Sequence, residues 1–400
     1  MAAAAGVATL RRVRIAHVTD CYPPRSGGIE SQVADLAAQQ AAAGDDVHVL
    51  TATPAAQPRH AAPSGPRPGS QGGATVHRIV ARLPFELPVN PAAPRAVRAL
   101  LGELSPDVVH VHAGVVSPFA FDGARIAIRQ GLPTAITWHC MLDGIVLALR
   151  AAVRASGWRA APVALSAVSR VAASRVAQVF EASVQVLPNG IDLEAWSPGG
   201  GLPAEALGDG VRLRLVAATR LAPRKRAAAL IDVLAAAAAE LPPGSVRLTV
   251  FGSGPAARRV AVKAAALRGE PSVELRGRVP RAELRAAYTQ ADVFLAPAAL
   301  ESFGLAALEA RTAGLAVLAR RGTGIEEFVD HEVDGLLAAS DADMARAVVR
   351  LARDPSLLAA IRSHNRAAPP GFGWPRVLAL AAAEYRRAIR LATVDHRVGL

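Results

Sequence analysis

The feature that most constrains the fold is a strand–turn–helix unit that repeats along the chain, stops and then starts again. Apolar runs such as DVHVLTA and DVVHVHA alternate with helical stretches such as IESQVADLAAQQAAAG. These runs lack clean alternation, which is typical of parallel strands buried on both faces. After the Pro- and Gly-rich stretch WSPGGGLPAEALGDG, the order begins again at VRLRLVAAT. The sequence therefore predicts an α/β protein with two doubly wound, Rossmann-like domains.

The restart also sets the predicted domain limits, residues 1–198 and residues 199–375. Residues 54–73 interrupt the first domain, and their Pro, Gly and Ser content predicts a mobile loop or local disorder. The last stretch, GWPRVLALAAAEYRRAIRL, predicts an amphipathic helix whose long apolar face needs a surface to pack on. Sheets of this kind bind ligands at the carboxyl ends of strands, so a cleft between the domains is the expected site.

The charge of the chain constrains its partners. The formal net charge is +12, and nearly all basic residues are Arg, with Lys225 and Lys263 the two exceptions. The sequence has no long block of like charges and only 4% aromatic residues, so we expect no nucleic-acid partner. The N-terminal arginines follow a short apolar stretch, the reverse of a secretory signal, which predicts a cytoplasmic protein. A basic surface would also suit the anionic inner face of a membrane, and this peripheral contact stays open.

Glycines mark two strand-to-helix junctions. Gly27 and Gly28 stand between the first strand and a helix that begins near Ile29, and Gly252 and Gly254 follow a strand in VFGSGPAARR. Glycines let the backbone approach a ligand closely, and the N-terminus of a helix offers free N–H groups to an anion. Neither junction has the full dinucleotide fingerprint, and a tight turn would also explain each of them.

A pair of cations follows another strand. Arg220 ends the strand in AATRLAPRKRAAALI, and Lys225 is predicted to open the next helix. An Arg fork together with a Lys point charge can hold a diphosphate. A solvated basic turn is the alternative, although Lys is rare in this chain.

The stretch ESFGLAALEARTAG places two carboxylates around a helix start. Glu301 precedes a helix predicted over about 304–313, and Glu309 lies more than one turn inside it. If Glu309 faces the cleft, each carboxylate can accept hydrogen bonds from its own pair of hydroxyls. Two sugar rings joined by phosphates would match this arrangement, with the phosphates at the helix N-terminus. A solvated helix face is the alternative.

Histidines end or line buried strands. His139, at the end of ITWH, can hold a substrate hydroxyl, act as an acid or base, or be structural. His110 and His112 alternate with Val and are expected to be structural. Cys21 and Cys140 form neither a disulfide framework nor a metal quartet, and we expect them to be small buried hydrophobes.

Taken in chain order, SGGIE, LPNGID, TRLAPRK, GSGP and ESFGLAALEARTAG closely resemble the motifs of retaining GT-B glycosyltransferases of family four. The resemblance covers nearly the whole chain. It implies the GT-B fold, with a nucleotide-sugar donor in the second domain, a hydroxyl acceptor in the first, and residues 376–400 crossing back to the first domain.

The resemblance also implies roles for single residues. Glu309 would bind the ribose, Glu301 the hydroxyls of the donor sugar, and Arg220 and Lys225 the diphosphate. The implied catalytic residues are His139, Arg220, Lys225 and Glu301, and the implied donor-binding residues are Gly27, Gly28, Gly252, Gly254, Ser302, Phe303, Gly304, Leu305 and Glu309. Ser169 falls where such proteins often close the cleft.

One motif departs from the family pattern, because RRGTGIEEFV has Ile325 and Glu326 where Pro–Glu is usual. The identity of the donor is therefore open between a GDP-sugar and a UDP-sugar. We expect no metal and no cofactor beyond the nucleotide-sugar co-substrate. A nucleotide-sugar epimerase of the same fold and a non-catalytic nucleotide-sugar-binding module are the alternative functions.

Overall fold

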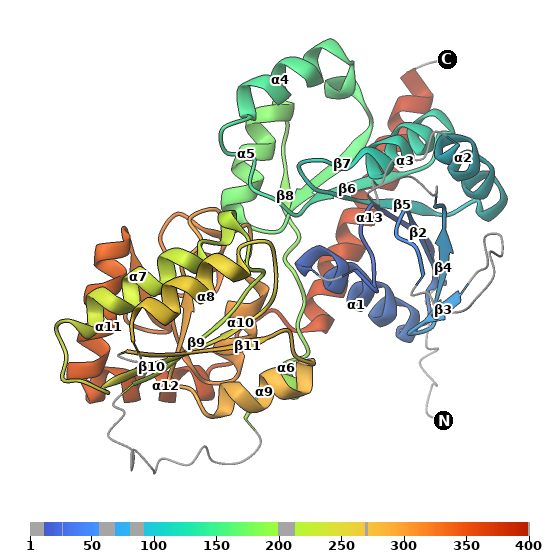
Figure 1. Ribbon diagram of the computed structural model, residues 1–400. Helices are drawn as coiled ribbons and strands as arrows, with labels where there is room; N and C mark the ends of the chain where they lie inside the picture. Colours follow the sequence, from blue (N-terminus) through green and yellow to red (C-terminus); the bar gives the residue numbers. More distant parts are fainter. Residues whose placement is uncertain are drawn as a thin grey trace, which may run out of the picture.

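The computed structural model describes residues 12–25, 27–55, 69–80, 92–198, 213–268 and 271–398. Within these ranges the chain forms two lobes, each built on one sheet with helices on both faces (Figure 1). We call them the N-terminal lobe and the C-terminal lobe. The predicted α/β fold with two doubly wound sheets is confirmed.

The sheet of the N-terminal lobe has eight strands in the order β3-β4-β2-β1-β5-β6-β7-β8. Their bounds are β1 (Arg14–Thr19), β2 (Asp46–Thr51), β3 (Gly69–Gln71), β4 (Ala74–Arg78), β5 (Val108–Ala113), β6 (Thr134–Trp138), β7 (Val163–Ala167) and β8 (Gln185–Val186). All neighbours pair in parallel except β3, which runs antiparallel to β4. The strand order reverses between β1 and β5, so the carboxyl ends of these strands are the expected ligand-binding edge.

Helices cover both faces of this sheet. One face carries α2 (Ala93–Leu104), α3 (Pro118–Arg129) and α5 (Arg170–Phe180), whose apolar side chains share one core with the strands. The other face carries α1 (Gly28–Ala42) and the C-terminal helix α13 (Trp374–Val398). The short helix α4 (Val146–Ala155) contacts α5 at one end of the lobe.

The sheet of the C-terminal lobe has six parallel strands in the order β11-β10-β9-β12-β13-β14. Their bounds are β9 (Leu213–Ala218), β10 (Val246–Phe251), β11 (Ser272–Gly277), β12 (Val293–Ala296), β13 (Ala316–Arg320) and β14 (Gly335–Ala338). The order reverses between β9 and β12, which pair directly. Most residues of β9 and β12 are buried, because helices pack on both faces of the sheet.

The helices of this lobe also divide between the two faces. One face carries α7 (Ala227–Ala238), α8 (Ala257–Ala266), α11 (Asp341–Arg353) and α12 (Pro355–Ala367). The other carries α6 (Leu193–Trp196), α9 (Arg281–Thr289) and α10 (Leu305–Thr312). Trp196 of α6 is buried in the core of this second face, so the chain joins the C-terminal lobe before β9 begins.

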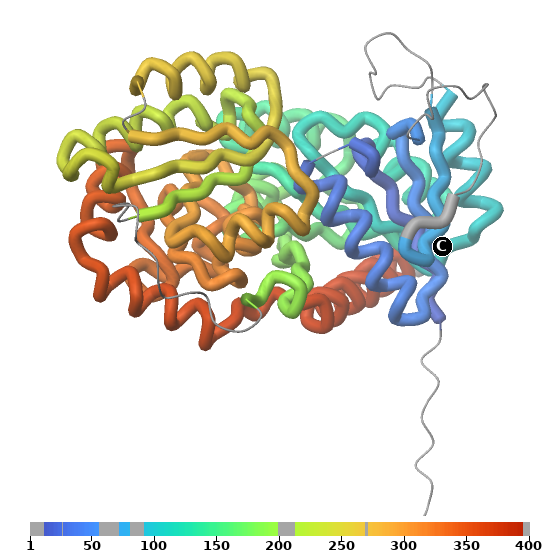
Figure 2. The backbone as a smooth tube through the Cα atoms, turned by 60° about the horizontal axis from the view of Figure 1, so that its bottom comes forward, coloured from blue at the N-terminus to red at the C-terminus, as the bar shows by residue number. Residues whose placement is uncertain are grey.

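The C-terminal helix returns to the N-terminal lobe. Helix α13 starts beside the C-terminal lobe and runs beneath the N-terminal sheet, next to α1 (Figure 2). Ala381, Tyr385 and Ala388 pack into the core with β1, β5 and α1. The long apolar face predicted for the last stretch of the sequence thus has its packing surface. Among the described helices, none has the length and apolar character needed to span a bilayer.

Two sequence predictions fall partly outside the described residues. The predicted domain boundary lies between residues 198 and 199, and residues 199–212 are outside the described ranges. The predicted mobile loop at 54–73 is wrong at its end, where residues 69–71 form β3. Gly72 and Gly73 both have positive φ, 59° and 83°, so they supply the tight turn that closes the β3–β4 hairpin. Residues 56–68 of that prediction lie outside the described residues.

Candidate active site

The candidate site begins where two neighbouring strands of the C-terminal sheet end. Arg220 and Lys225 follow β9, and Glu301 follows β12. These strands are adjacent at the point where the strand order reverses, so their terminal loops meet. The Nζ of Lys225 lies 2.5 Å from Oε2 of Glu301, and both side chains are only partly exposed.

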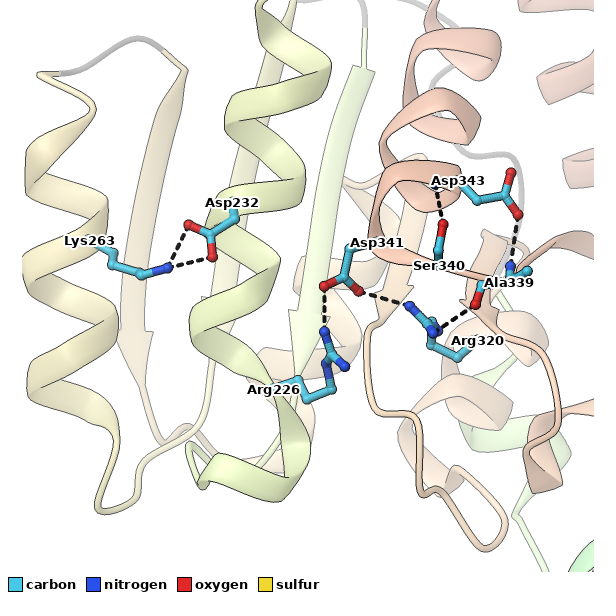
Figure 3. A network of polar contacts seen from close by, with 8 residues as sticks. All are labelled: Arg226, Asp232, Lys263, Arg320, Ala339, Ser340, Asp341 and Asp343. Atoms are coloured by element: carbon cyan, nitrogen blue, oxygen red, sulfur yellow. Dashed lines mark hydrogen bonds and ion pairs between the residues drawn. The ribbon is translucent and has the colours of Figure 1, made fainter.

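A compact turn holds Lys225 in place. Pro223–Lys225 form a 3₁₀ turn, Arg226 follows with a positive φ of 57°, and helix α7 starts only at Ala227. The prediction that Lys225 opens this helix is therefore wrong by two residues, because the left-handed Arg226 separates turn and helix. Figure 3 shows how Arg226 is anchored: Asp341 lies between Arg226 and Arg320 and bonds both, with 2.9 Å to the Nη1 of Arg320.

The loop between β12 and α10 exposes backbone donors. Gly304 has a φ of 91°, and a Cβ there would lie 2.5 Å from Ile325, so this position requires glycine. Within the described chain, the N–H groups of Phe303, Gly304 and Leu305 have no acceptor. Helix α10 begins at Leu305, close to the predicted start. These three N–H groups therefore lie at the N-terminus of the helix, where they can donate to an anion bound beside Glu301. The Phe303 side chain is buried in the core, so only its backbone faces the site.

His139 joins this loop from the other lobe. It follows β6 directly, and its carbonyl accepts a hydrogen bond of 2.8 Å from the Ser302 hydroxyl. Because Ser302 follows Glu301, the contact places His139 beside the Glu301–Lys225 pair. Burial lowers the pKa of His139 to about 4, so the ring is neutral at physiological pH.

A hollow of about 480 Å³ lies between the lobes, at the carboxyl ends of β9 and β10. The N-terminal lobe lines this hollow with Pro24, Arg25 and Gly27. The C-terminal lobe lines it with residues that include Arg220, Gly252 and Gly254. The Arg220 side chain is exposed and has no hydrogen-bond partner within the described residues, so it is free to bind an anion here. Gly28, the first residue of α1, has open space around its Cα.

The two C-terminal glycines are required by the backbone itself. Gly252 and Gly254 have φ values of 129° and 156°. A Cβ at Gly252 would lie 1.9 Å from the carbonyl oxygen of Thr219, and one at Gly254 would lie 2.5 Å from that of Leu221. The glycines therefore let the ends of β9 and β10 approach each other, which brings Arg220 to the rim of the hollow.

Glu309 lies in a different place from Glu301. It is 7% exposed and lines a second, narrower hollow together with Leu305, Asp35 and Arg281. Burial raises the pKa of Glu309 to about 8, partly offset by Arg281 and reinforced by Asp35. The structure therefore brings Glu301, Lys225, Ser302 and His139 together, and places Glu309 in a separate hollow.

Neighbouring residues have roles that sequence reasoning assigned differently. Ser169 is fully buried, and its hydroxyl caps α5 by accepting the N–H of Ala172. The next residue, Arg170, contacts the other lobe instead: its backbone N–H donates to Oε1 of Glu327 at 2.6 Å. Ile325 fills the core beside Gly304, and Glu326 accepts the N–H of Gly322 within its own loop.

Sequence reasoning missed a further contact between the lobes. Arg281 of α9 donates to Asp35 of α1 at 2.8 Å, beside Glu309. The two residues are 246 positions apart and belong to no motif. Each lies on a helix face that reads as ordinary solvated surface, so only the placement of the lobes reveals the pair.

Two facing doubly wound sheets, a C-terminal helix that crosses back and a cleft lined by both lobes define the GT-B architecture. Comparison with known proteins agrees. Residues 26–195 match the family model Glycosyltransferase Family 4, and residues 212–354 match the model Glycosyl transferases group 1. The D-inositol 3-phosphate glycosyltransferase of Frankia alni is 30% identical over 413 residues, with 92% of this chain and 96% of that protein covered. The chain belongs to glycosyltransferase family 4.

A second relative and two solved structures extend the comparison. The GDP-mannose-dependent alpha-(1-6)-phosphatidylinositol monomannoside mannosyltransferase of Mycolicibacterium smegmatis is 29% identical over 360 residues, covering 86% of this chain and 90% of that protein. Anabaena HepE in complex with UDP and glucose superposes with a TM-score of 0.71 at 18% identity, covering 93% of this chain and 99% of that one. Sucrose-phosphate synthase from Thermosynechococcus elongatus gives 0.72 at 20% identity, covering 94% and 99%. At these identities the structures support the fold alone, the GT-B fold predicted from the motifs.

Proposed function

We propose that this glycosyltransferase transfers a sugar from a GDP- or UDP-sugar to a hydroxyl acceptor with retention of the anomeric configuration. The observation that carries the proposal is the Lys225–Glu301 pair, set beside three backbone N–H groups that have no acceptor among the described residues, at the switch point of the C-terminal sheet. A cation and free amides suit a diphosphate, and a carboxylate suits sugar hydroxyls.

The donor would lie across the rim of the large hollow. Lys225 and Arg220 would hold the diphosphate together with the amides of Phe303, Gly304 and Leu305. Gly252 and Gly254 would let the nucleotide approach the backbone, and Gly27 and Gly28 would close on the phosphates from the other lobe. The Glu301 carboxylate would accept hydrogen bonds from the donor sugar, and Glu309, reached by movement of Arg281, would accept those of the ribose.

The chemistry follows from this placement. Breaking the anomeric bond leaves an oxocarbenium-like sugar and a negative diphosphate, and Lys225, Arg220 and the amides stabilise the developing negative charge. An acceptor hydroxyl held on the same face as the leaving group would attack from that face, which gives retention by geometry. The leaving phosphate oxygen takes the proton of the acceptor hydroxyl. His139 would contact a hydroxyl of the donor sugar.

The two cations make a metal ion unnecessary in this scheme, so we propose catalysis without one. Activity that is lost on chelation and restored by magnesium would disprove that part. The two cysteines, Cys21 and Cys140, are free thiols, which suits our proposal that the reaction takes place in the reducing cytoplasm. The net charge of +12 favours an acceptor at the anionic inner face of a membrane.

The test is a thermal-shift panel of GDP-, UDP- and ADP-sugars, followed by transfer assays with the donor that stabilises the chain. The named relatives use GDP-mannose or D-inositol 3-phosphate, so GDP-mannose as donor, with inositol phosphates and phosphatidylinositol mannosides as acceptors, comes first. We expect selective stabilisation by one base and a product whose anomeric configuration matches that of the donor.

Two other outcomes would redirect the proposal. Conversion of the donor to its epimer without any acceptor would identify a nucleotide-sugar epimerase. Stabilisation by a sugar nucleotide without turnover or donor hydrolysis would indicate a non-catalytic binding module. If the wild type hydrolyses the donor slowly and Lys225→Ala does not, the binding-module alternative is excluded.

A further inference from the structure

A row of four histidines runs through the core of the N-terminal lobe and ends at the active site. His17 of β1, His110 and His112 of β5, and His139 after β6 are all 9% exposed or less. The register pairs His17 with His110 across β1 and β5, and places His112 beside Thr137 across β5 and β6. Four polar rings in the interior of a sheet carry a cost in free energy unless their nitrogens are hydrogen-bonded.

Three of these rings form a continuous hydrogen-bonded chain. Nε2 of His139 lies 3.0 Å from Nδ1 of His112, whose Nε2 lies 2.9 Å from Nδ1 of His17. The chain ends at Gln40 of α1, whose amide oxygen lies 2.7 Å from Nε2 of His17. Gln40 thus connects to His139 through two intervening rings.

A second branch leaves Gln40 on its other side. The Gln40 amide nitrogen donates to the Tyr385 hydroxyl of α13 at 2.8 Å, and this hydroxyl lies 2.9 Å from Nδ1 of His110. Nε2 of His110 then lies 2.7 Å from the Thr137 hydroxyl, which lies 2.8 Å from that of Ser166. One amide side chain therefore joins both branches.

The same histidines could be read as a metal site, because His17, His110 and His112 offer ligand atoms within 4.8 Å of one another. Each of their six ring nitrogens, however, already has a hydrogen-bond partner in the chain. The protein's own bonds account for the cluster, so its arrangement points to a hydrogen-bond relay.

The partners give the relay a direction. An amide oxygen only accepts, so Nε2 of His17 carries the proton. A neutral ring has one N–H, so Nδ1 of His17 accepts from Nε2 of His112, and Nδ1 of His112 accepts in turn from Nε2 of His139. The other branch runs outward from the same amide: Tyr385 donates to His110, which donates to Thr137. Ser166 ends this branch, with its hydroxyl 3.5 Å from the carbonyl oxygen of Ile136.

We propose that Gln40, held by Tyr385, fixes the tautomer of His139 through His112 and His17, so that Nδ1 of His139 presents a lone pair to the active site. Gln40, His17, His112 and Tyr385 are positioning residues in this scheme. If the Gln40 amide were turned over, every bond of both branches would reverse, and His139 would present an N–H instead. One amide orientation therefore decides whether His139 accepts or donates.

The consequence for the reaction rests on the proposed function. Within the described residues, Nδ1 of His139 has no hydrogen-bond partner, and the His139 carbonyl is bound by Ser302 beside Glu301. A lone pair at that atom accepts a hydrogen bond from a sugar hydroxyl, whereas an N–H would oppose the donating hydroxyl. Burial lowers the pKa of all four histidines, which keeps the rings neutral and so maintains one N–H on each ring.

The relay also gives the crossing helix a role in the active site. Tyr385 is the point where α13, which comes from the C-terminal lobe, bonds to Gln40 and His110 in the N-terminal lobe. Removing its hydroxyl leaves the Gln40 amide without the acceptor that fixes its orientation. The C-terminal helix would therefore act on His139 without approaching the substrate.

The experiment is two-bond ¹H–¹⁵N NMR of the full chain with ¹⁵N-labelled histidine, which distinguishes Nδ1–H from Nε2–H tautomers. Signals are assigned by loss in His→Gln variants. We expect His17, His110, His112 and His139 all as Nε2–H in the wild type. In Gln40→Met, which keeps the volume but cannot take part as an amide, we expect an Nδ1–H population of His139. Turnover should fall roughly tenfold, with nucleotide affinity unchanged.

Ser166→Ala is the matched control, because it removes a buried hydroxyl at the end of the other branch. It should leave the His139 tautomer and turnover as in the wild type. An Nδ1–H signal from His139 in the wild type, or an unchanged His139 tautomer in Gln40→Met, would overturn the proposal. Tyr385→Phe provides the second variant if Gln40→Met does not fold. The NMR result needs no substrate, so failure of the proposed transferase activity is seen separately.

Discussion

Lys225 and Glu301 lie 76 positions apart in the sequence, and their charged atoms are 2.5 Å apart in the structure. The contact exists because β9 and β12 are neighbours at the switch point of the C-terminal sheet, so the loops that follow them share one edge. The pair orients both side chains before any donor binds. Lys225 is thereby held on Glu301, two residues before Phe303, at the loop that leads into α10.

Replacing Lys225 by Ala should lower turnover by roughly 10²-fold, because a cation that stabilises the leaving diphosphate is lost. The chain offers a matched control in its other lysine. Lys263 of α8 is bound by Asp232 of α7 (Figure 3), and Lys263→Ala should leave turnover near that of the wild type. Steady-state kinetics with the donor found in the thermal-shift panel measure both. Near-normal turnover in Lys225→Ala would reject its role at the diphosphate.

A second prediction concerns the pH dependence of donor binding through Glu309. Burial raises the pKa of Glu309 to about 8, so the carboxyl is mainly protonated in the free enzyme at neutral pH. Binding ribose hydroxyls to the ionised carboxylate then releases a proton, and nucleotide affinity should rise by about fivefold from pH 7 to pH 8. Calorimetry in two buffers of different ionisation enthalpy measures both the affinity and the released proton.

Glu309→Gln supplies the control for this effect, since it keeps the shape and cannot ionise. Its nucleotide affinity should be weaker and nearly constant over the same pH range. An equal rise with pH in the variant would show that another group titrates and would contradict the assignment of Glu309.

Much of the fold was predictable because it depends on local patterns. The buried apolar runs, the turns and the restart after the linker predicted both sheets, and α10 begins within one residue of its expected start. Helix boundaries that depend on the dihedral angles of a single residue are harder to predict from the sequence. The sequence predicts a helix start at Lys225, because nothing in PRKRAA signals that Arg226 takes a positive φ. The hairpin of β3 was missed because its strand is only three residues long.

The candidate site was predictable only in part, for a physical reason. Residue type and strand ends pointed to Lys225, Glu301 and His139, but not to their contacts. Contacts between lobes, such as Arg281 with Asp35, depend on how two rigid units face each other, which no local pattern encodes. The histidines of VVHVHAG were recognised as buried and structural, yet their hydrogen-bonded connection to His139 requires β1, β5, α1 and α13 in place.

A third prediction tests the close approach at the donor site. Gly252→Ala places a Cβ against the carbonyl of Thr219 at a φ of 129°, so it should lower the free energy of unfolding by about 2–3 kcal/mol. Gly102→Ala is the control, because Gly102 lies inside helix α2 with its nearest neighbour at 3.6 Å. It should be neutral or stabilise by up to about 1 kcal/mol. Urea unfolding measures both, and equal stability of the two variants would contradict the backbone contact.

The last prediction concerns acid stability, which the buried histidines should control. Burial lowers the pKa of His17 and His139 to about 4, and lowers those of His110 and His112 well below the ordinary value for histidine. In the unfolded chain these histidines become protonated near pH 6.5. In the folded chain their rings stay neutral at that pH because their pKa values are lowered. Their contribution to stability is therefore fully present above about pH 6.5 and is lost as the pH falls toward 4.

Two buried carboxyls oppose this trend. Burial raises the pKa of Asp20 to about 6 and that of Glu309 to about 8, so each favours the folded state as the pH falls. Between pH 6 and 5 the four histidines outnumber the two carboxyls, so these groups take up protons on balance when the chain unfolds. Stability should therefore fall as the pH falls from 6 to 5, by about 1.4 kcal/mol per pH unit for each proton taken up on balance.

Urea unfolding at pH 7, 6 and 5, followed by tryptophan fluorescence, measures this slope. Glu309→Gln removes one opposing carboxyl and should steepen the loss by about 1.4 kcal/mol per pH unit. A stability that is constant from pH 6.5 to 5 would mean that the four rings already take up protons in the folded state. The neutral hydrogen-bonded relay from Gln40 to His139 could not then exist.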